Sequence, residues 1–154
     1  MAYEVPRSVV EAFYKVYAAR DVEKIADFLA DDAVWTISGP IDLLPFCGSH
    51  RGKAAVIDVI GRQIPMVLRT FSFVPDAILV QGDRAAMLSR QSSRRSKDGR
   101  TICYRVANFM RFRDDKLVEN ISLIDSFDVV EQVLGHPLAV PGGVRGNGGD
   151  LVAI

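Results

Sequence analysis

The order of elements along the chain predicts an α+β fold, in which helices cover one face of a curved, mainly antiparallel sheet. Apolar residues recur at helical spacing over residues 6–19, 22–29 and 53–64. Most of the chain between residues 71 and 127 instead alternates apolar with polar positions and is interrupted by turn residues. Helices that precede a run of strands are typical of domains whose helices gather on one face of the sheet.

The N-terminal third has clear helix and strand boundaries. Pro6 suits the first turn of a helix, and Asp21 is expected to cap a second, shorter helix. A strand is expected at residues 33–38, with Ala33, Trp35 and Ile37 on one face. An irregular loop with His50 near its end should follow.

The middle of the chain should contain one more helix and then two hairpins. A helical pattern resumes at Lys53, and Pro65 is expected to end or kink it, because proline has no N–H to donate. Gly82 and Asp83 mark one turn between strands. Asp98 and Gly99 mark a second turn, for which the sequence favours type I′. Arg90, Arg94, Arg95, Lys97 and Arg100 surround this second turn and are expected to form a solvated tip.

Residues 104–127 read as two long strands joined at Asp114 and Asp115, since Asp tolerates the left-handed backbone of a tight turn. A short helix should follow at residues 129–134 and stop at Gly135. The residues that share a face of the hairpin are Val106, Asn108, Met110 and Phe112 on the outgoing strand and Asn120, Ser122 and Ile124 on the return. A few polar groups on an apolar wall are typical of a ligand cavity, and equally of a core whose polar groups bond one another.

The chain is expected to form a single domain over residues 1–135, followed by a tail at 136–154. At 154 residues it is long enough to bury a core. Half of its twelve glycines fall in the last twenty residues, so we expect a mobile tail there.

Composition excludes several classes of function. Nineteen basic residues balance nineteen acidic ones, so no overall field favours nucleic acid or an anionic membrane. Cys47 and Cys103 lack metal-ligand spacing, and two reduced thiols are the simplest interpretation. No signal peptide and no apolar run of ~20 residues is found, which predicts a cytoplasmic protein. Phosphate-loop, dinucleotide and metalloprotease motifs are also missing, and we expect neither cofactor nor metal.

Three segments together resemble a known superfamily. They are VVEAFYKVYAARDVEKIADFLADDAVW, HRGKAAVIDVI and NFMRFRDDKLVENISLIDSFD, and they occur in the expected order. They resemble the SnoaL-like and ketosteroid-isomerase-like branches of the nuclear-transport-factor-2-like (NTF2-like) superfamily. The resemblance implies a cone-shaped, cystatin-like α+β barrel that encloses a cavity, and a homodimer paired through the sheet.

The catalytic residues of these relatives are mostly not matched. Ketosteroid isomerases use a tyrosine and two aspartates, where this chain has Phe13, Asn108 and Ile37. The Asp-Arg-Asp set of the limonene-epoxide-hydrolase relatives aligns with Asn108, Val106 and Ser122. For the acid of SnoaL-type polyketide cyclases, Asp125 is the one nearby candidate.

Asp125 and His50 are therefore the candidate catalytic residues, as a carboxyl acid or base and a proton shuttle. Asp125 could instead cap the last helix, and His50 could be an exposed loop residue. The candidate substrate-binding residues are Tyr14, Tyr17, Trp35, Asn108, Asn120 and Ser122. Ordinary core packing is the alternative for Trp35, and mutual hydrogen bonding is the alternative for the two amides.

Taken together, the sequence predicts a protein with a cavity for a hydrophobic small molecule. Cofactor-free acid/base catalysis of the isomerase, cyclase or dehydratase type, on a cyclic or polyketide-like compound, is one interpretation. A non-catalytic ligand-binding or dimerisation domain is the other.

Overall fold

The computed structural model describes residues 2–139, and these residues form one curved sheet with helices around it. The helices are α1 (Arg7–Ala18), α2 (Val22–Phe28), α3 (Lys53–Asp58), α4 (Ile64–Val67) and α5 (Ser126–Leu134). The strands are β1 (Leu29–Ser38), β2 (Gly48–Arg51), β3 (Leu68–Gln81), β4 (Arg84–Arg95), β5 (Thr101–Arg113) and β6 (Lys116–Ile124). A π-helical segment, Val59–Gln63, joins α3 to α4.

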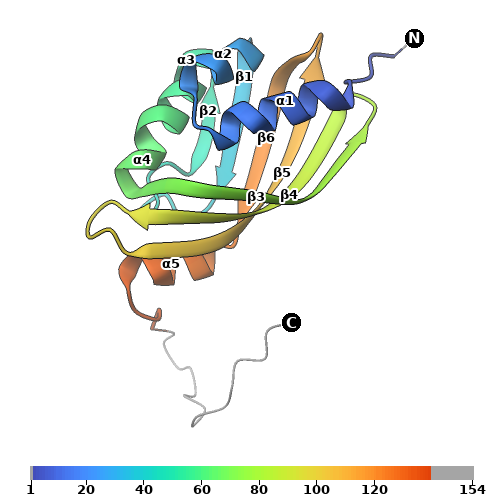
Figure 1. Ribbon diagram of the computed structural model, residues 1–154. Coiled ribbons are helices and arrows are strands. Elements are labelled where there is room, and N and C mark those ends of the chain that lie inside the picture. The colour runs from blue at the N-terminus through green and yellow to red at the C-terminus, as the bar shows by residue number, and fades with distance from the viewer. Residues whose placement is uncertain (1, 140–154) are drawn as a thin grey trace.

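The sheet has the order β2-β1-β6-β5-β4-β3. Strands β1 and β6 pair in parallel, and every other neighbouring pair is antiparallel. Figure 1 shows α1 crossing one face of the curved sheet, α3 and α4 beside β2, and α5 at the far end, beneath β3, β4 and β5. The predicted α+β class, with helices gathered over one face, is confirmed.

The core lies between α1 and the concave face of the sheet. Helix α1 buries Val10, Phe13, Tyr14 and Tyr17, which are spaced by three or four residues and so share one face of the helix. The rings of Tyr17 and Trp35 stack with centroids 5.6 Å apart, and Phe13 lies 5.9 Å from Tyr17. This aromatic cluster fixes α1 against β1.

Two predicted local structures are confirmed. The side chain of Asp21 accepts a hydrogen bond from the Lys24 N–H at 3.2 Å, as an N-cap should. Asp114 and Asp115 have φ angles of 49° and 59°, which places both in the left-handed region that the tight turn requires.

Two local predictions are wrong, and a third is met in only one of its alternatives. Residues 48–51 form a strand instead of a loop, and His50 pairs with Trp35 of β1; Gly48, at φ 101°, allows the chain to reverse before β2. Pro65 does not end the helical region, which continues to Val67; the regular α-helix is instead interrupted just before Pro65 by the π-helical segment Val59–Gln63, which agrees with the alternative of a kink. In the β4–β5 loop only Gly99 has positive φ, at 74°, so this turn is not type I′.

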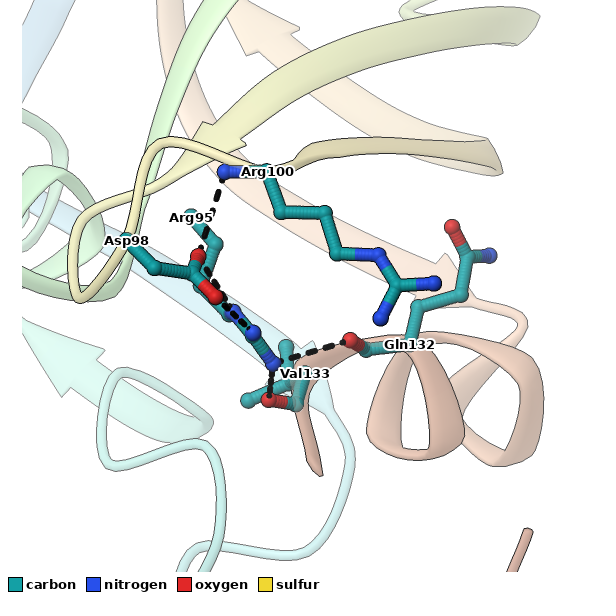
Figure 2. Close-up of polar contacts among 5 residues, drawn as sticks. All are labelled: Arg95, Asp98, Arg100, Gln132 and Val133. Atoms are coloured by element: carbon teal, nitrogen blue, oxygen red, sulfur yellow. Dashed lines mark hydrogen bonds and ion pairs between the residues drawn. The ribbon is translucent and has the colours of Figure 1, made fainter. Parts of the chain in front are cut away.

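The basic tip of the β4–β5 hairpin is also not simply solvated. Arg95 donates to the carbonyl oxygens of Gln132 and Val133 at the end of α5, and its guanidinium also pairs with Asp98 (Figure 2). Only 12% of the Arg95 side chain is exposed. The last carbonyls of a helix lack partners within the helix, so Arg95 stabilises the C-terminus of α5 and fixes it to the hairpin.

The last helix ends as expected at Gly135, which adopts a left-handed conformation with φ 82°. The predicted glycine-rich tail lies outside the described residues from position 140 onward. Among residues 2–139, no helix has the length and apolar character needed to cross a membrane.

Candidate functional site

A small cavity lies inside the cone, between α1, the concave face of the sheet and α5. Its free volume is about 40 Å³. The residues that line it are Tyr17, Arg20, Trp35, Ile37, Phe46, Ile64, Leu68, Gln91, Tyr104, Val106, Ser122, Ile124 and Val129. The wall is thus largely aromatic and aliphatic, with a few polar groups from separate elements, as in sites for small molecules.

Arg20 brings the one charged side chain of this lining. It follows α1 at φ 56°, a left-handed conformation that ends the helix and turns the chain toward α2. Its guanidinium lies 4.3 Å from the centroid of the Tyr17 ring, and its Nη2 donates to Gln91 Oε1 at 3.3 Å. Its Nη1 is buried and has no partner within the described chain.

The hydroxyl oxygen of Ser122 already accepts two hydrogen bonds. Asn108 Nδ2 and Asn120 Nδ2 each donate to Ser122 Oγ at 2.8 Å, and Asn108 Nδ2 also donates to Asn120 Oδ1 at 3.2 Å. A hydroxyl has two acceptor positions and one proton. The two amides occupy both acceptor positions, which leaves the Ser122 O–H to donate.

Trp35 contributes a further donor. Its ring is 1% exposed, lines the cavity and stacks on Tyr17. Its Nε1 is buried, and the described residues provide no acceptor for it. An indole N–H can only donate, and a buried donor without a partner costs about 1–3 kcal/mol.

A chain of three hydroxyls connects the cavity to the surface. Tyr104 lines the cavity, and its hydroxyl lies 2.9 Å from Ser93 Oγ, which lies 2.9 Å from Thr70 Oγ1. Burial raises the pKa of Tyr104, although the hydrogen bond with Ser93 acts in the opposite direction. Tyr104 is therefore a neutral phenol near pH 7.

A second hollow of about 210 Å³ lies outside the cavity, between α4, the start of β3 and the residues that precede and begin α2. It is lined by Arg69 and Thr70, and it shares Arg20, Ile64 and Leu68 with the inner cavity. These three shared side chains form the wall between the two spaces.

The predicted binding residues divide into three groups. Tyr17, Trp35 and Ser122 line the cavity. Asn108 and Asn120 lie behind Ser122 and donate hydrogen bonds to its hydroxyl. The mutual hydrogen bonding that the sequence offered as the alternative to ligand contact is therefore present. Tyr14 is packed elsewhere in the core, with its hydroxyl 3.5 Å from Met110 Sδ, and burial raises its pKa far above the ordinary value.

The predicted catalytic pair is not brought together at the cavity. Asp125 is exposed, lies outside the lining and accepts the Asp128 N–H at 3.3 Å, which is the capping role at α5. His50 bonds through Nε2 to the Phe46 carbonyl at 2.9 Å and is also outside the lining. An exposed carboxylate is easily solvated, so Asp125 lacks the burial on which its expected acid/base role depended.

The residues that sequence reasoning missed are Arg20, Gln91 and Tyr104. Gln91 belongs to a row on β4, together with Ser89 and Ser93, that is buried on the concave face. Its neighbours Arg90, Ser92 and Arg94 are polar too, so hydropathy does not distinguish the two faces of this segment. Arg20 is a polar residue in a helix–helix connection, and nothing in the sequence pattern marks it as a site residue.

Cys47 and Cys103 are free, and burial raises the pKa of the Cys47 thiol to about 11. In residues 2–139, no group of three or more His, Cys, Asp or Glu side chains is placed to hold a metal ion.

Comparisons with known proteins agree with this architecture. The family model for the SnoaL-like domain matches residues 10–120. A crystal structure from Rhodopseudomonas palustris, of a protein assigned provisionally to the isomerases, is 34% identical with a TM-score of 0.72, covering 82% of this chain and 93% of that one. No curated protein matches the chain.

Two other solved structures show the same fold at lower identity. An NTF2-like protein of unknown function from Burkholderia pseudomallei is 21% identical, with a TM-score of 0.74, covering 82% of this chain and 95% of that one. TerC, co-crystallised with polyporic acid, is 21% identical with a TM-score of 0.73, covering 82% and 96% of the two chains. The NTF2-like fold expected from the three segments is confirmed.

Proposed function

Because the chain belongs to the SnoaL-like domain family, we propose that it binds a small, mainly apolar cyclic molecule in the cavity between α1, α5 and the sheet. The observation that carries this proposal is a buried aromatic wall that includes donors without partners, on Arg20 and Trp35. A core without a ligand gains nothing from such donors, because each buried donor that lacks a hydrogen-bond partner costs free energy. TerC, which shares the fold, was co-crystallised with polyporic acid, and this supports small-molecule binding by a chain of this fold.

The free volume also indicates how the ligand is accommodated. About 40 Å³ is well below the roughly 150 Å³ of a cavity that binds benzene. A ring therefore requires the cavity to widen, and the outer hollow of about 210 Å³ lies just beyond Ile64 and Leu68. We expect the ligand to displace these two side chains and to occupy both spaces.

Trp35 gives a direct test, because it is the one tryptophan of the chain and it lines the cavity. Steroids and aromatic polyketides should change its fluorescence at saturable concentrations and raise the melting temperature. The cavity-filling variant Val129→Phe should lose this response. The control Val74→Phe, at an exposed position of β3, should keep it. If no compound produces a response, or if both variants respond equally, the cavity is not a binding site.

A second candidate function is cofactor-free proton transfer on such a ligand, of the isomerase, cyclase or dehydratase type. The neutral hydroxyl of Tyr104, linked through Ser93 to Thr70, supports it as a proton donor at the cavity. The lining contains no carboxylate and no histidine to act as a base, which is why binding is the first proposal.

The two functions differ in whether a bound ligand exchanges carbon-bound hydrogen. Cyclic ketones that bind the protein would be incubated in D₂O and followed by NMR. Catalysis predicts exchange above the buffer rate that is reduced in Tyr104→Phe and unchanged in Asp125→Asn, since asparagine also caps helices. Binding without exchange supports the non-catalytic function.

We also propose that the chain pairs with a second copy through the outer face of the sheet. Apolar side chains with exposures between 38% and 69% lie there on adjacent strands: Leu79, Leu88, Phe109, Ile121 and Leu123. Phe109 is in register with Ile121 of β6 and with Ala86 of β4, so the patch is continuous across strands. Light scattering should give a dimer mass for wild type and for Met66→Glu on α4, and a monomer mass for Phe109→Glu. A monomeric wild type would refute the pairing.

A further inference from the structure

We propose that the ligand of the cavity is an organic acid, whose ionised carboxylate is held by Arg20 while its apolar ring lies against Tyr17 and Trp35. This inference rests on the proposed binding function and specifies the chemical class of the ligand.

The first argument is the uncompensated charge of Arg20. No carboxylate lies within 4.0 Å of its guanidinium in the part of the chain that the structure describes. Neither the cavity nor the outer hollow has an Asp or Glu in its lining, whereas Arg69 adds a second positive charge to the outer one. A partly buried guanidinium is stabilised by an anion that can accept from it, and a planar carboxylate fits its geometry.

The second argument is the polarity of the other groups in the lining. The Ser122 hydroxyl has both acceptor positions filled by the two amides and can only donate. The Trp35 indole is also a donor without a partner. Gln91 Oε1, an acceptor, is already used by Arg20. Residues on three separate elements of the lining therefore carry donors, two of which have no partner within the described chain; the one unpartnered buried acceptor there, Asn108 Oδ1, lies in the amide network behind Ser122. A ligand rich in acceptor atoms would satisfy the donors of Arg20 and Trp35.

The third argument is that Arg20 is held in place before any ligand binds. Tyr17 lies 4.3 Å below its guanidinium and Gln91 accepts from Nη2 at 3.3 Å, while Nη1 remains free of partners among the described residues. Binding then needs little further ordering of this long side chain, which lowers the entropic cost. A cationic ligand would instead be repelled by the same charge.

The position of Arg20 agrees with an acid that enters from outside. Arg20 lines both the inner cavity and the outer hollow, together with Ile64 and Leu68. The charged group can stay at this junction, near water, while the ring moves inward and packs against the Tyr17–Trp35 pair. The costly burial of a free carboxylate in the apolar interior is avoided.

Matched pairs of acid and amide give the test: benzoate with benzamide, and 2-naphthoate with 2-naphthamide, titrated by calorimetry at pH 7. Each pair has nearly the same shape and differs in charge. In the wild type we expect the acid to bind at least about tenfold more tightly than its amide, the difference that a charge-assisted hydrogen bond typically makes. Arg20→Gln should remove this preference and keep amide binding, while Arg20→Lys should retain part of it. Arg51→Gln, on the exposed strand β2, should bind as the wild type does.

Each outcome decides between the two proposals. If acid and amide bind the wild type equally, or if the preference persists in Arg20→Gln, the organic-acid inference is wrong and the binding function stands. If no compound of either kind binds, and the steroid and polyketide compounds also fail, both are wrong. The wild-type comparison needs no variant, so it remains decisive even if Arg20→Gln does not fold.

Discussion

The buried amide network behind the cavity allows a quantitative prediction. Asn108 is 3% exposed and donates two hydrogen bonds, to Asn120 Oδ1 at 3.2 Å and to Ser122 Oγ at 2.8 Å. The variant Asn108→Ala removes both bonds and leaves Asn120 Oδ1 buried without a donor. Each lost bond costs about 1 kcal/mol, and a stranded buried acceptor costs about 1–3 kcal/mol. Removal of Asn108 Oδ1, which is itself buried without a partner among the described residues, offsets about 1 kcal/mol of this cost. We expect a loss of about 2–4 kcal/mol in the free energy of unfolding.

Urea unfolding followed by Trp35 fluorescence measures this loss, and thermal unfolding should show a decrease of roughly 5–15 °C. Thr101→Ala, at an exposed position on the same strand β5, should change stability by less than about 0.5 kcal/mol. In Asn108→Ala/Asn120→Ala, part of the cost should disappear, because the stranded acceptor is removed with its donor. Strict additivity of the two single variants, or a loss below about 1 kcal/mol for Asn108→Ala, would contradict the network as described.

Three further predictions concern other parts of the molecule. Arg95→Ala should lower the melting temperature and speed hydrogen exchange in α5, whereas Lys97→Ala in the same loop should do neither. Burial raises the pKa of Cys47 to about 11, so at pH 8 Ellman's reagent should label the exposed second cysteine quickly and Cys47 only as the protein unfolds. Hydrogen bonds from Arg62 lower the pKa of Asp58 in the folded state to about 2. Because this pKa lies below the ordinary value, the ionised carboxylate stabilises the fold above about pH 4, and this stabilisation is lost as the pH falls toward 2. Wild type should therefore lose more stability than Asp58→Asn over that interval.

Local sequence patterns were sufficient to predict the caps, turns and strand faces that depend only on residues close together in the chain. The cap at Asp21 and the Asp114–Asp115 turn depend on a few consecutive residues, and both were predicted. The inward face of β5 followed from alternation alone, since its even-numbered positions from Ile102 to Phe112 are largely buried. Such features need little knowledge of what packs against them.

Predictions failed where the outcome depends on a distant partner. Residues 48–51 form a strand because β1 offers an edge to pair with, and nothing in the sequence GSHR indicates it. Arg95 looked like a solvent-exposed member of a basic turn, but α5 brings unpaired carbonyls to it from 37 residues away. Asp125 was assigned two alternative roles, and the docking of α5 places it at the helix start and outside the cavity.

The sequence by itself determined the α+β class, the family resemblance and the inward position of Trp35, Asn108 and Ser122, because periodicity and turn chemistry are properties of short segments. Only the tertiary structure decided which polar groups meet at the cavity. Arg20 follows α1, Trp35 lies on β1 and Ser122 on β6, and their convergence is a consequence of how α1 crosses the sheet and how β1 and β6 pair. Residues so far apart in the chain are brought together by packing alone, so the donor-rich character of the site is visible only in the folded protein.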